Sequence, residues 1–327
     1  MKRTDFVRLL SRTHLLLPPL SGFTDFPYRQ ILARFNPPFI ITEMVNAKAV
    51  LMKNKKTMEM LRQVTGAHKN GVQLLGHDPE EMAQAACILQ SLGFDYIDIN
   101  MGCTVKKVVS KGQGVALMRN EERACDIVEK VSCIVEVPVT VKMRLGYSDT
   151  SANLISFSKR LEESGATALT IHARSGEKKF GATIDYETVS QVASSLSIPV
   201  IVNGGITGKN ALDVIEISQA AAVMPGRSII GNPWIINEIL SSFGQCVYQE
   251  PNLSHRKDVV FDHVSLLSDF FGEQTGVVRF RKILPKYFES CKNLRMIKTD
   301  VKVVTSISDV TYLLSRITED KGSIVYR

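Results

Sequence analysis

Short runs rich in apolar and β-branched residues recur along roughly the first 230 residues, and longer stretches of mixed polarity separate them. The runs begin about every thirty residues, a spacing that suits one strand followed by one crossover helix. They are Leu15–Leu17, Phe39–Thr42, Gly71–Leu74, Tyr96–Asn100, Val139–Met143, Ala168–Ala173, Val200–Asn203 and Ala222–Met224. Eight such units predict an α/β protein whose parallel strands close into a (β/α)8 barrel, because parallel strands need both faces covered.

The stretches between the runs carry helix signals. Asp78 and Pro79 supply an N-cap and a first-position proline, and Gly93 ends the same helix. Apolar residues recur at three- and four-residue spacing over Glu121–Val131 and Asn153–Glu163. An open doubly wound sheet is the alternative, but its glycine fingerprint follows the first strand, whereas the glycine-rich stretches here follow late strands. We therefore predict a TIM barrel.

From about Pro251 the strand rhythm stops and helical periodicity replaces it. Amphipathic helices are expected over Arg256–Phe271, Val277–Ser290 and Ser306–Ile317. The simplest interpretation is two domains, a barrel over residues 1–245 and a small C-terminal helical domain over residues 246–327.

The composition limits the class of protein. Hydrophobic residues make up 44% of the chain and charged residues 22%, as in ordinary globular proteins. No stretch approaches the roughly eighteen apolar residues of a membrane span, and no secretory signal follows Met1, so we expect a cytoplasmic protein. The six cysteines form no CxxC pair and no Cys/His pattern, so neither a disulfide framework nor a metal site is expected. A net charge of +7 is compatible with a polyanionic partner, although many basic proteins bind none.

Polar or glycine residues stand at the end of nearly every predicted strand, and in a barrel these ends meet at one mouth. Asn203–Gly205 follows the seventh run and Gly226–Arg227 the eighth, which are the two places where barrels form phosphate sites. Glycines there let backbone N–H groups approach a phosphate, although tight turns alone would also explain them. Because the chain has no Walker-type lysine loop, the phosphate is expected to belong to a bound cofactor.

Three further strand-end side chains suit a cofactor. Lys142 ends a buried strand, where its charge can stabilise negative charge such as that of a reduced flavin. Gln73 can present its amide to the edge of a heterocycle, and His172 ends another strand at the same mouth.

Cys103 differs from the other cysteines in its surroundings. It follows the fourth run in a loop that holds Lys106, Lys107 and Lys111 and no acid before Glu121. Nearby cations make a thiol more reactive. Since no histidine and asparagine pattern accompanies Cys103, we interpret it as a proton donor rather than a protease-type nucleophile.

Eight motifs resemble those of the tRNA-dihydrouridine synthase family in order and spacing. The matching segments are Pro19–Asp25, Thr42–Val45, Val72–Gly76, Asp98–Cys103, Val141–Gly146, Ile171–Arg174, Asn203–Ile206 and Met224–Arg227. Three positions depart from the family pattern, and one of them is Pro225, which precedes Gly226 where the family more often has Ile or Leu. Thr104 stands where the family usually has proline after the cysteine, and Leu20 stands where the opening motif usually has methionine.

The resemblance implies an FMN-dependent oxidoreductase that reduces the C5–C6 double bond of specific uridines in tRNA, with NADPH or NADH as reductant. It implies that residues 1–245 bind FMN through Pro19, Leu20, Ser21, Gln73, Lys142, His172, Asn203, Gly204, Gly205, Gly226 and Arg227. Cys103 would be the catalytic proton donor to C5, and Asn100, Arg144 and Arg174 would contact the substrate. The target uridine must leave its stack to reach the flavin.

A basic segment between Arg279 and Lys302 would then make residues 246–327 a tRNA-binding domain. Its cations are Arg279, Arg281, Lys282, Lys286, Lys292, Arg295, Lys298 and Lys302, against Glu289 and Asp300. Such a run is usually a solvated face, but with the resemblance we expect a grip on the tRNA backbone that the loop lysines after Cys103 share. Two alternatives stay open, another FMN-dependent pyrimidine oxidoreductase and a non-catalytic flavin-barrel RNA-binding protein. We expect a monomer that binds no membrane.

Overall fold

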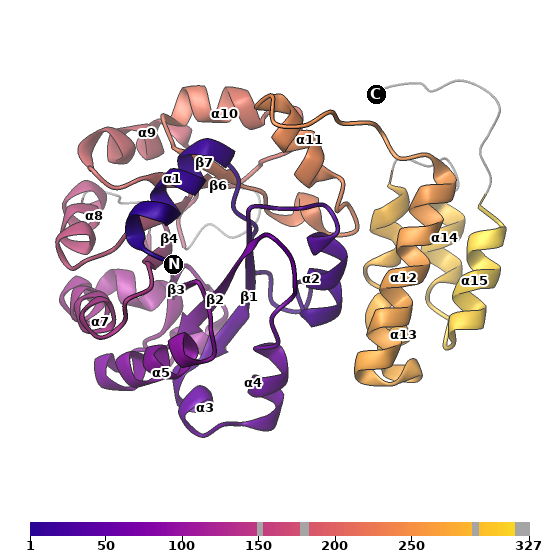
Figure 1. Ribbon diagram of the computed structural model, residues 1–327, viewed down its shortest axis with the longest axis horizontal. Helices are drawn as coiled ribbons and strands as arrows, with labels where there is room; N and C mark the ends of the chain where they lie inside the picture. Colours follow the sequence, from indigo (N-terminus) through magenta and orange to yellow (C-terminus); the bar gives the residue numbers. More distant parts are fainter. Residues whose placement is uncertain (149–152, 177–182, 290–293, 318–327) are drawn as a thin grey trace.

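The computed structural model describes residues 1–148, 153–176, 183–289 and 294–317 of the 327-residue chain. Seven strands form one parallel sheet in chain order, and the sheet curls inside a ring of helices (Figure 1). The strands are β1 (Phe39–Asn46), β2 (Lys69–Leu75), β3 (Tyr96–Met101), β4 (Val139–Arg144), β5 (Ala168–His172), β6 (Val200–Asn203) and β7 (Ala222–Met224). The predicted α/β barrel class is therefore confirmed.

The first predicted strand, Leu15–Leu17, is reduced to one parallel bridge between Leu15 and Val223 of β7. The N–H of Leu16 donates to the carbonyl of Val223 at 3.1 Å, but in the described ranges no ladder joins this segment to β1. Pro18 and Pro19 follow at once, and a proline has no N–H with which to continue a ladder. Hydrogen bonding therefore does not run all the way round the barrel.

The outer helices include the three that the sequence predicts, over Asp78–Gly93, Glu121–Val131 and Asn153–Glu163. They are α1 (Arg3–Thr13), α2 (Phe26–Ala33), α3 (Ala47–Leu51), α4 (Lys55–Met60), α5 (Pro79–Ser91), α6 (Lys106–Val109), η1 (Gly114–Arg119), α7 (Glu121–Ile134), α8 (Leu154–Glu163), α9 (Tyr186–Ser195), α10 (Ala211–Ser218), η2 (Arg227–Ile229) and α11 (Ile235–Ser242). At the start of α5 the Asp78 carboxylate accepts from the N–H of Glu81 at 2.9 Å, and Gly93 follows its end at a φ of 89°. The predicted capping of this helix is confirmed.

The amino-terminal end of the barrel is filled by apolar side chains. Alternate strand residues point inward, and those nearest this end, such as Phe39 and Tyr96, pack on Phe6 of α1. The Phe6 ring centroid lies 4.9 Å from that of Phe39 and 5.4 Å from that of Tyr96. Gly71 pairs with Tyr96, and a Cβ there would lie 2.1 Å from the Tyr96 ring. Space for a ligand is thus left at the opposite, carboxyl end.

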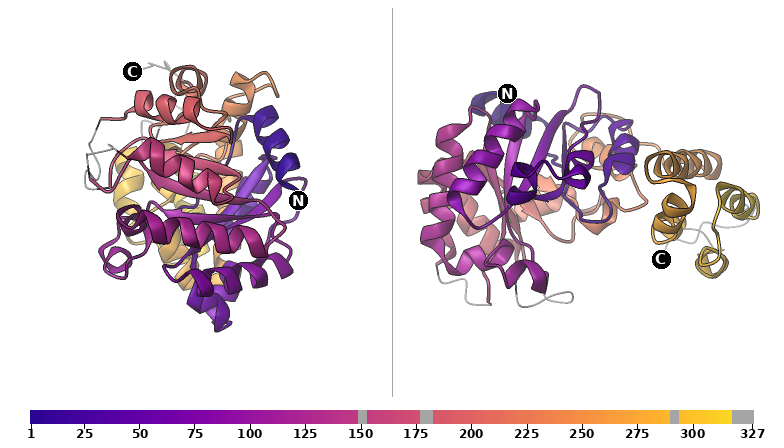
Figure 2. Two further views of the ribbon diagram at one scale, coloured as in Figure 1. Left: turned by 90° about the vertical axis from the view of Figure 1, so that its left-hand side faces the viewer. Right: turned by 90° about the horizontal axis from the view of Figure 1, so that it is seen from below.

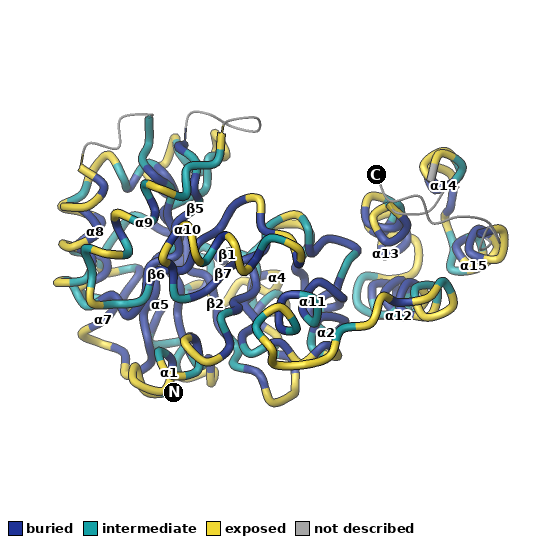
Figure 3. The backbone as a smooth tube through the Cα atoms, turned by 90° about the horizontal axis from the view of Figure 1, so that it is seen from above, coloured by how far each residue is buried: buried dark blue, intermediate teal, exposed yellow. Residues whose placement is uncertain are grey.

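The C-terminal helices lie beside the barrel, next to α2 and α11 (Figures 1 and 2). They are α12 (Leu253–Phe271), α13 (Glu273–Phe280), η3 (Leu284–Phe288), α14 (Leu294–Asp300) and α15 (Ile307–Ser315). Buried and exposed residues alternate along α12, α13 and α15 (Figure 3). The predicted domain division at 245–246 falls between α11 and α12.

The prediction of one helix over Val277–Ser290 was wrong. Helix α13 ends at Phe280, and the chain resumes as the short 3-10 helix η3 around Pro285. Proline lacks the N–H of a continuous helix and disfavours helical geometry in the residue before it. Ser290 lies outside the described residues.

A buried aromatic contact fixes the helical part to the barrel. The ring of Tyr28 on α2 stacks on His263 of α12 with centroids 4.7 Å apart, and His263 Nδ1 is hydrogen-bonded to the Tyr287 hydroxyl at 2.9 Å. The N–H of Gly231 donates to the Tyr28 hydroxyl at 3.1 Å. Burial lowers the pKa of His263 to about 3, so this ring stays neutral. The two parts therefore share a packed aromatic contact, and the Arg34 guanidinium at the end of α2 pairs with the Asp262 carboxylate of α12 beside it.

Candidate active site

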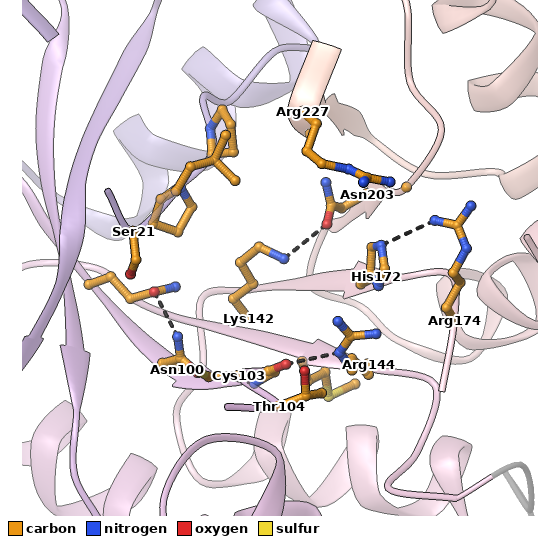
Figure 4. A pocket seen from close by; sticks show the side chains of 18 of the residues that line it. Ser21, Asn100, Cys103, Thr104, Lys142, Arg144, His172, Arg174, Asn203 and Arg227 are labelled. Atoms are coloured by element: carbon orange, nitrogen blue, oxygen red, sulfur yellow. Dashed lines mark hydrogen bonds between the residues drawn. The ribbon is translucent and has the colours of Figure 1, made fainter. Parts of the chain in front are cut away.

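A cavity of about 510 Å³ opens at the carboxyl ends of the strands. Its wall contains all the residues predicted to hold a cofactor, from Pro19 to Arg227, and also four predicted chemical or substrate residues: Asn100, Cys103, Arg144 and Arg174. They come from the ends of β2 to β7 and from the segment Pro19–Ser21, and the labelled side chains, among them Lys142, His172 and Asn203, lie close together (Figure 4). The described residues that line this cavity do not include Lys106, Lys107, Lys111, Arg279, Arg281, Lys282 or Lys286.

Lys142 of β4 reaches into the centre of the cavity (Figure 4). Its ammonium donates to Asn203 Oδ1 at 3.0 Å, and Asn203 Nδ2 donates to the Met224 carbonyl at 2.8 Å. Removal from water lowers the pKa of Lys142 to about 8, while Asp98 opposes this shift and Arg144 adds to it. The site thus holds a cation that sheds its proton more readily than an exposed lysine.

Asp98 lies just below the cavity floor and was missed as a site residue in the sequence. Its side chain is only 3% exposed, and it accepts from Thr140 Oγ1 at 2.6 Å and from Gln73 Nε2 at 2.7 Å. Burial raises its pKa to about 6, and the hydrogen bonds and the Lys142 charge oppose that rise. The available signal was the alternation of β3, which puts Asp98 on the same inward face as Asn100.

The backbone around Cys103 is held from several sides. Asn100 Oδ1 accepts from the N–H groups of Gly102 and Cys103 at 3.2 and 3.0 Å. The Cys103 carbonyl accepts from the N–H of Val115 at 3.0 Å, and Arg144 Nε donates to the Gly102 carbonyl at 2.9 Å. The loop therefore has a fixed path although Thr104 stands at the position where the family usually has proline.

His172 brings an unpaired nitrogen to the cavity wall. Among the described residues, its buried Nδ1 has no hydrogen-bond partner, and its Nε2 lies 3.5 Å from a guanidinium nitrogen of Arg174. Burial, together with the charges of Lys142, Arg144 and other cations, lowers the pKa of His172 to about 2. The ring is thus neutral at physiological pH, and its Nδ1 is a buried polar atom whose hydrogen bonding the described residues leave unsatisfied.

Glycines make a cradle at the other end of the cavity. Gly204 and Gly205 have φ values of 119° and 69°, which other residues rarely adopt. A Cβ at Gly226 would meet no atom closer than 3.9 Å, so the space above its backbone is open. Arg227 lies beside Asn203 at this end (Figure 4). Exposed backbone next to a guanidinium suits an anionic group such as a phosphate.

Four of the eight predicted tail cations, Arg279, Arg281, Lys282 and Lys286, contact other groups of the fold. Lys282 Nζ donates to the Gly22 carbonyl and lies 4.3 Å from the Phe23 ring centroid. Arg281 Nε donates to the Val304 carbonyl at 2.8 Å, and Arg279 lies 3.9 Å from the Phe271 ring centroid. Lys286 pairs with the Glu289 carboxylate.

Two more basic features lie outside the main cavity. Lys106 lines a neighbouring cavity of about 470 Å³ with Tyr147, while Lys107 and Lys111 are exposed. A separate shallow groove on and just after α14 is lined by Arg295, Lys298, Thr299 and Lys302. Lys292 lies outside the described residues. In the described part of the chain, no helix combines the length and apolarity needed to cross a membrane.

Comparisons with known proteins agree on one family. The family model of dihydrouridine synthase (Dus) matches residues 16–319. A probable tRNA-dihydrouridine synthase of Rickettsia bellii is 32% identical over 322 residues, which are 96% of this chain and 97% of that protein. The tRNA-dihydrouridine synthase B of Pasteurella multocida is 35% identical over 280 residues, which are 85% and 84% of the two chains.

Solved structures support the fold. Histamine dehydrogenase from Rhizobium sp. 4-9 superposes with a TM-score of 0.51 at 11% identity, over 77% of this chain and 49% of that one. The 6-hydroxypseudooxynicotine amine oxidase of Pseudomonas geniculata N1 superposes with a TM-score of 0.54 at 13% identity, over 76% and 50%. This chain thus spans about half of each structure, and the likeness shows the barrel architecture.

Proposed function

The chain belongs to the dihydrouridine synthase family, and from that premise we propose that it uses FMN to reduce the C5–C6 double bond of uridines in tRNA. The observation that carries this proposal is the single cavity that contains Cys103 together with every residue expected to hold the flavin. A cavity of about 510 Å³ lies within the size range of cofactor pockets.

The residues present fit FMN at both ends of the cavity. The glycine cradle and Arg227 suit the phosphate, because positive-φ backbone and a guanidinium both favour an anion. His172 Nδ1 is a buried polar atom that needs a partner, and a heterocyclic ligand with polar edge atoms can provide one. Lys142 adds positive charge between these groups, which favours an electron-rich ring system.

Bound FMN, with NADPH or NADH as the electron source, would supply the hydride for C6 of the uracil. Cys103 would donate its thiol proton to C5, so that hydride and proton together saturate the double bond. Arg144 holds the adjoining Gly102 carbonyl and would then face the thiolate that remains. Asn100, which holds the Cys103 N–H, would keep the thiol in place during this transfer.

The remaining cations would bind the tRNA. We assign phosphate contacts to the groove of Arg295, Lys298 and Lys302 and to the lysine loop after Cys103, because these side chains are exposed. Arg279, Arg281, Lys282 and Lys286 are kept as candidates, although the fold already engages them. We expect a monomer.

The test is the visible spectrum of the purified protein. A yellow protein whose flavin bands bleach with NADPH, and recover faster with unmodified tRNA than with free uridine, supports the proposal. Equal recovery with free uridine would favour an oxidoreductase for small pyrimidines instead. A colourless protein that takes up no added FMN would remove the flavin assignment and leave an RNA-binding protein.

A further inference from the structure

Asp98 has no role in the chemistry assigned so far, yet it is buried and hydrogen-bonded to Gln73 of the cavity wall. We propose that Asp98 is a positioning residue, which sets the direction of the side-chain amides of Gln73 and Asn100 and thereby holds the backbone of Cys103 in place. The inference deepens the proposed function, because Cys103 is the residue that it positions.

The first step is the direction of the Gln73 amide. A carboxylate only accepts hydrogen bonds, and Asp98 uses one oxygen for Thr140 Oγ1 at 2.6 Å and the other for Gln73 Nε2 at 2.7 Å. The NH2 group of Gln73 must therefore face Asp98. Its carbonyl oxygen then points the other way, where it accepts from Asn100 Nδ2 at 2.8 Å.

The second step carries this direction to the catalytic loop. Because the Asn100 NH2 is bound to Gln73, Asn100 Oδ1 faces the N–H groups of Gly102 and Cys103 at 3.2 and 3.0 Å. An amide side chain alone could turn either way, since its two ends have similar shapes. We call the hydrogen-bonded series from Asp98 through Gln73 and Asn100 to the Cys103 N–H the relay. The Asp98 carboxylate at its start only accepts, and it thereby fixes the direction of both amides.

Neighbouring charges support an ionised Asp98 at working pH. Lys142 on the adjacent β4 is the cation that faces it, and Tyr96 is the titratable group on its own strand. The Tyr96 pKa is raised well above 10 by burial, so Tyr96 stays neutral, and Lys142 keeps its proton below about pH 8. Asp98 is therefore ionised above about pH 6, where it accepts from Thr140 and Gln73 and fixes the direction of both amides.

Two variants test the relay. In D98N, residue 98 can turn either its carbonyl or its NH2 toward Gln73, so the direction is no longer imposed. In the double variant D98N/Q73E, the carboxylate at position 73 accepts from both Asn100 and the new amide at position 98. Asn100 is thereby turned back toward Cys103. D95N is the matched control, because Asp95 precedes the same strand and accepts from the Asn70 N–H at 2.8 Å at the far end.

The measurement is hydrogen exchange at the Gly102 and Cys103 amides, which requires neither FMN nor tRNA. We expect exchange to be about five- to tenfold faster in D98N, the loss of roughly one hydrogen bond. It should return toward the wild-type rate in D98N/Q73E and stay unchanged in D95N. Should D98N be unfolded, D98S is the substitute, since serine can also donate toward Gln73. The proposal is overturned if a folded variant at position 98 exchanges its Gly102 and Cys103 amides at the wild-type rate. It is also overturned if the double variant exchanges them as fast as D98N.

A second readout joins the relay to turnover. In FMN-loaded D98N, reduction by NADPH should keep its rate, while reoxidation by tRNA should slow about tenfold at an unchanged Kd for tRNA. If both half-reactions slow equally, Asp98 supports the flavin pocket as a whole and the positioning role is wrong. A wild-type protein that does not reduce tRNA would refute the proposed function, and the exchange rates would still decide the role of Asp98.

Discussion

The barrel mouth and the basic segment of the helical domain were both predicted from residue type, and they behave differently in the structure. At the mouth, Gln73, Lys142 and Arg227 come from strands far apart in sequence and still line one cavity. In the helical segment, Arg281 and Lys282 bind carbonyls of the fold, while Lys298 faces an open groove. Topology brings strand ends together, but no comparable rule gathers charges on short helices.

The largest effect expected at the mouth is that of C103A. Removing the proton donor should lower dihydrouridine formation at least 100-fold, because general acid catalysis contributes about 10²–10⁴ in rate. The bound FMN and its reduction by NADPH should stay, since Cys103 is not among the groups assigned to the flavin. Dihydrouridine content of tRNA by mass spectrometry is the measurement, with C133A, an exposed cysteine on α7, as control. Full activity of C103A would end the proton-donor role.

Much of this mouth could be predicted because a strand end has a defined place in a barrel. Lys142, His172 and Asn203 lie at or near the carboxyl ends of β4, β5 and β6, and their convergence follows from parallel topology alone. Asp98 was not predicted as a site residue because it lies within a strand. The sequence of one strand does not show which residues of the adjacent strands a polar side chain contacts. The Asp98 partners Gln73 and Thr140 are 25 and 42 residues away, and only the register of β2, β3 and β4 brings them together.

The tail could be predicted less well for a related reason. The charge pattern over Arg279–Lys302 gives the sign of the surface but not which cations remain exposed. The expected helix is broken before Pro285, and Lys286 in the following 3-10 helix pairs with Glu289. Such local turns depend on packing against the barrel, which periodicity along the chain does not report.

A triple variant, R295Q/K298Q/K302Q, tests whether the groove on α14 is the tRNA grip. Affinity for tRNA should fall about tenfold near physiological salt, and the slope of log K against log salt should flatten by roughly 2, because each phosphate contact releases counterions. FMN content should not change. The comparison is R279Q/K286Q, in which both removed cations already contact Phe271 or Glu289. A larger loss in that second variant would show that the grip lies on α13 and η3 instead.

A smaller effect is expected from pH at the mouth. The folded-state pKa of Lys142 is lowered to about 8, so its charge, and with it FMN affinity, should decline as pH rises through 8. The decline should be several-fold by about pH 9, by proton linkage, and absent from K142M. The free energy of unfolding of the apoprotein should change in the opposite direction. Between pH 8 and 10.5 the unfolded chain binds more protons at Lys142 than the folded chain, so this free energy rises with pH. Fluorescence titration of FMN from pH 7 to 9.5 measures the first effect. A flat wild-type curve would place Lys142 outside the flavin contact.

The smallest effect concerns Lys282, which connects the two regions. Its ammonium binds the Gly22 carbonyl, one residue after the predicted flavin contact Ser21, and lies over the Phe23 ring. Because Lys282 is exposed, K282M should cost only about 0.5–1 kcal/mol, or about 1–3 °C in Tm. FMN should be released about twice as fast, since the loop loses one anchor. K286M, whose partner Glu289 lies within the helical domain, should share the small loss of stability and leave FMN release unchanged. Equal rates of FMN release from K282M and K286M would contradict a role of Lys282 in holding the barrel loop. The contact between the Gly22 N–H and the Glu43 carboxylate would then suffice to hold that loop.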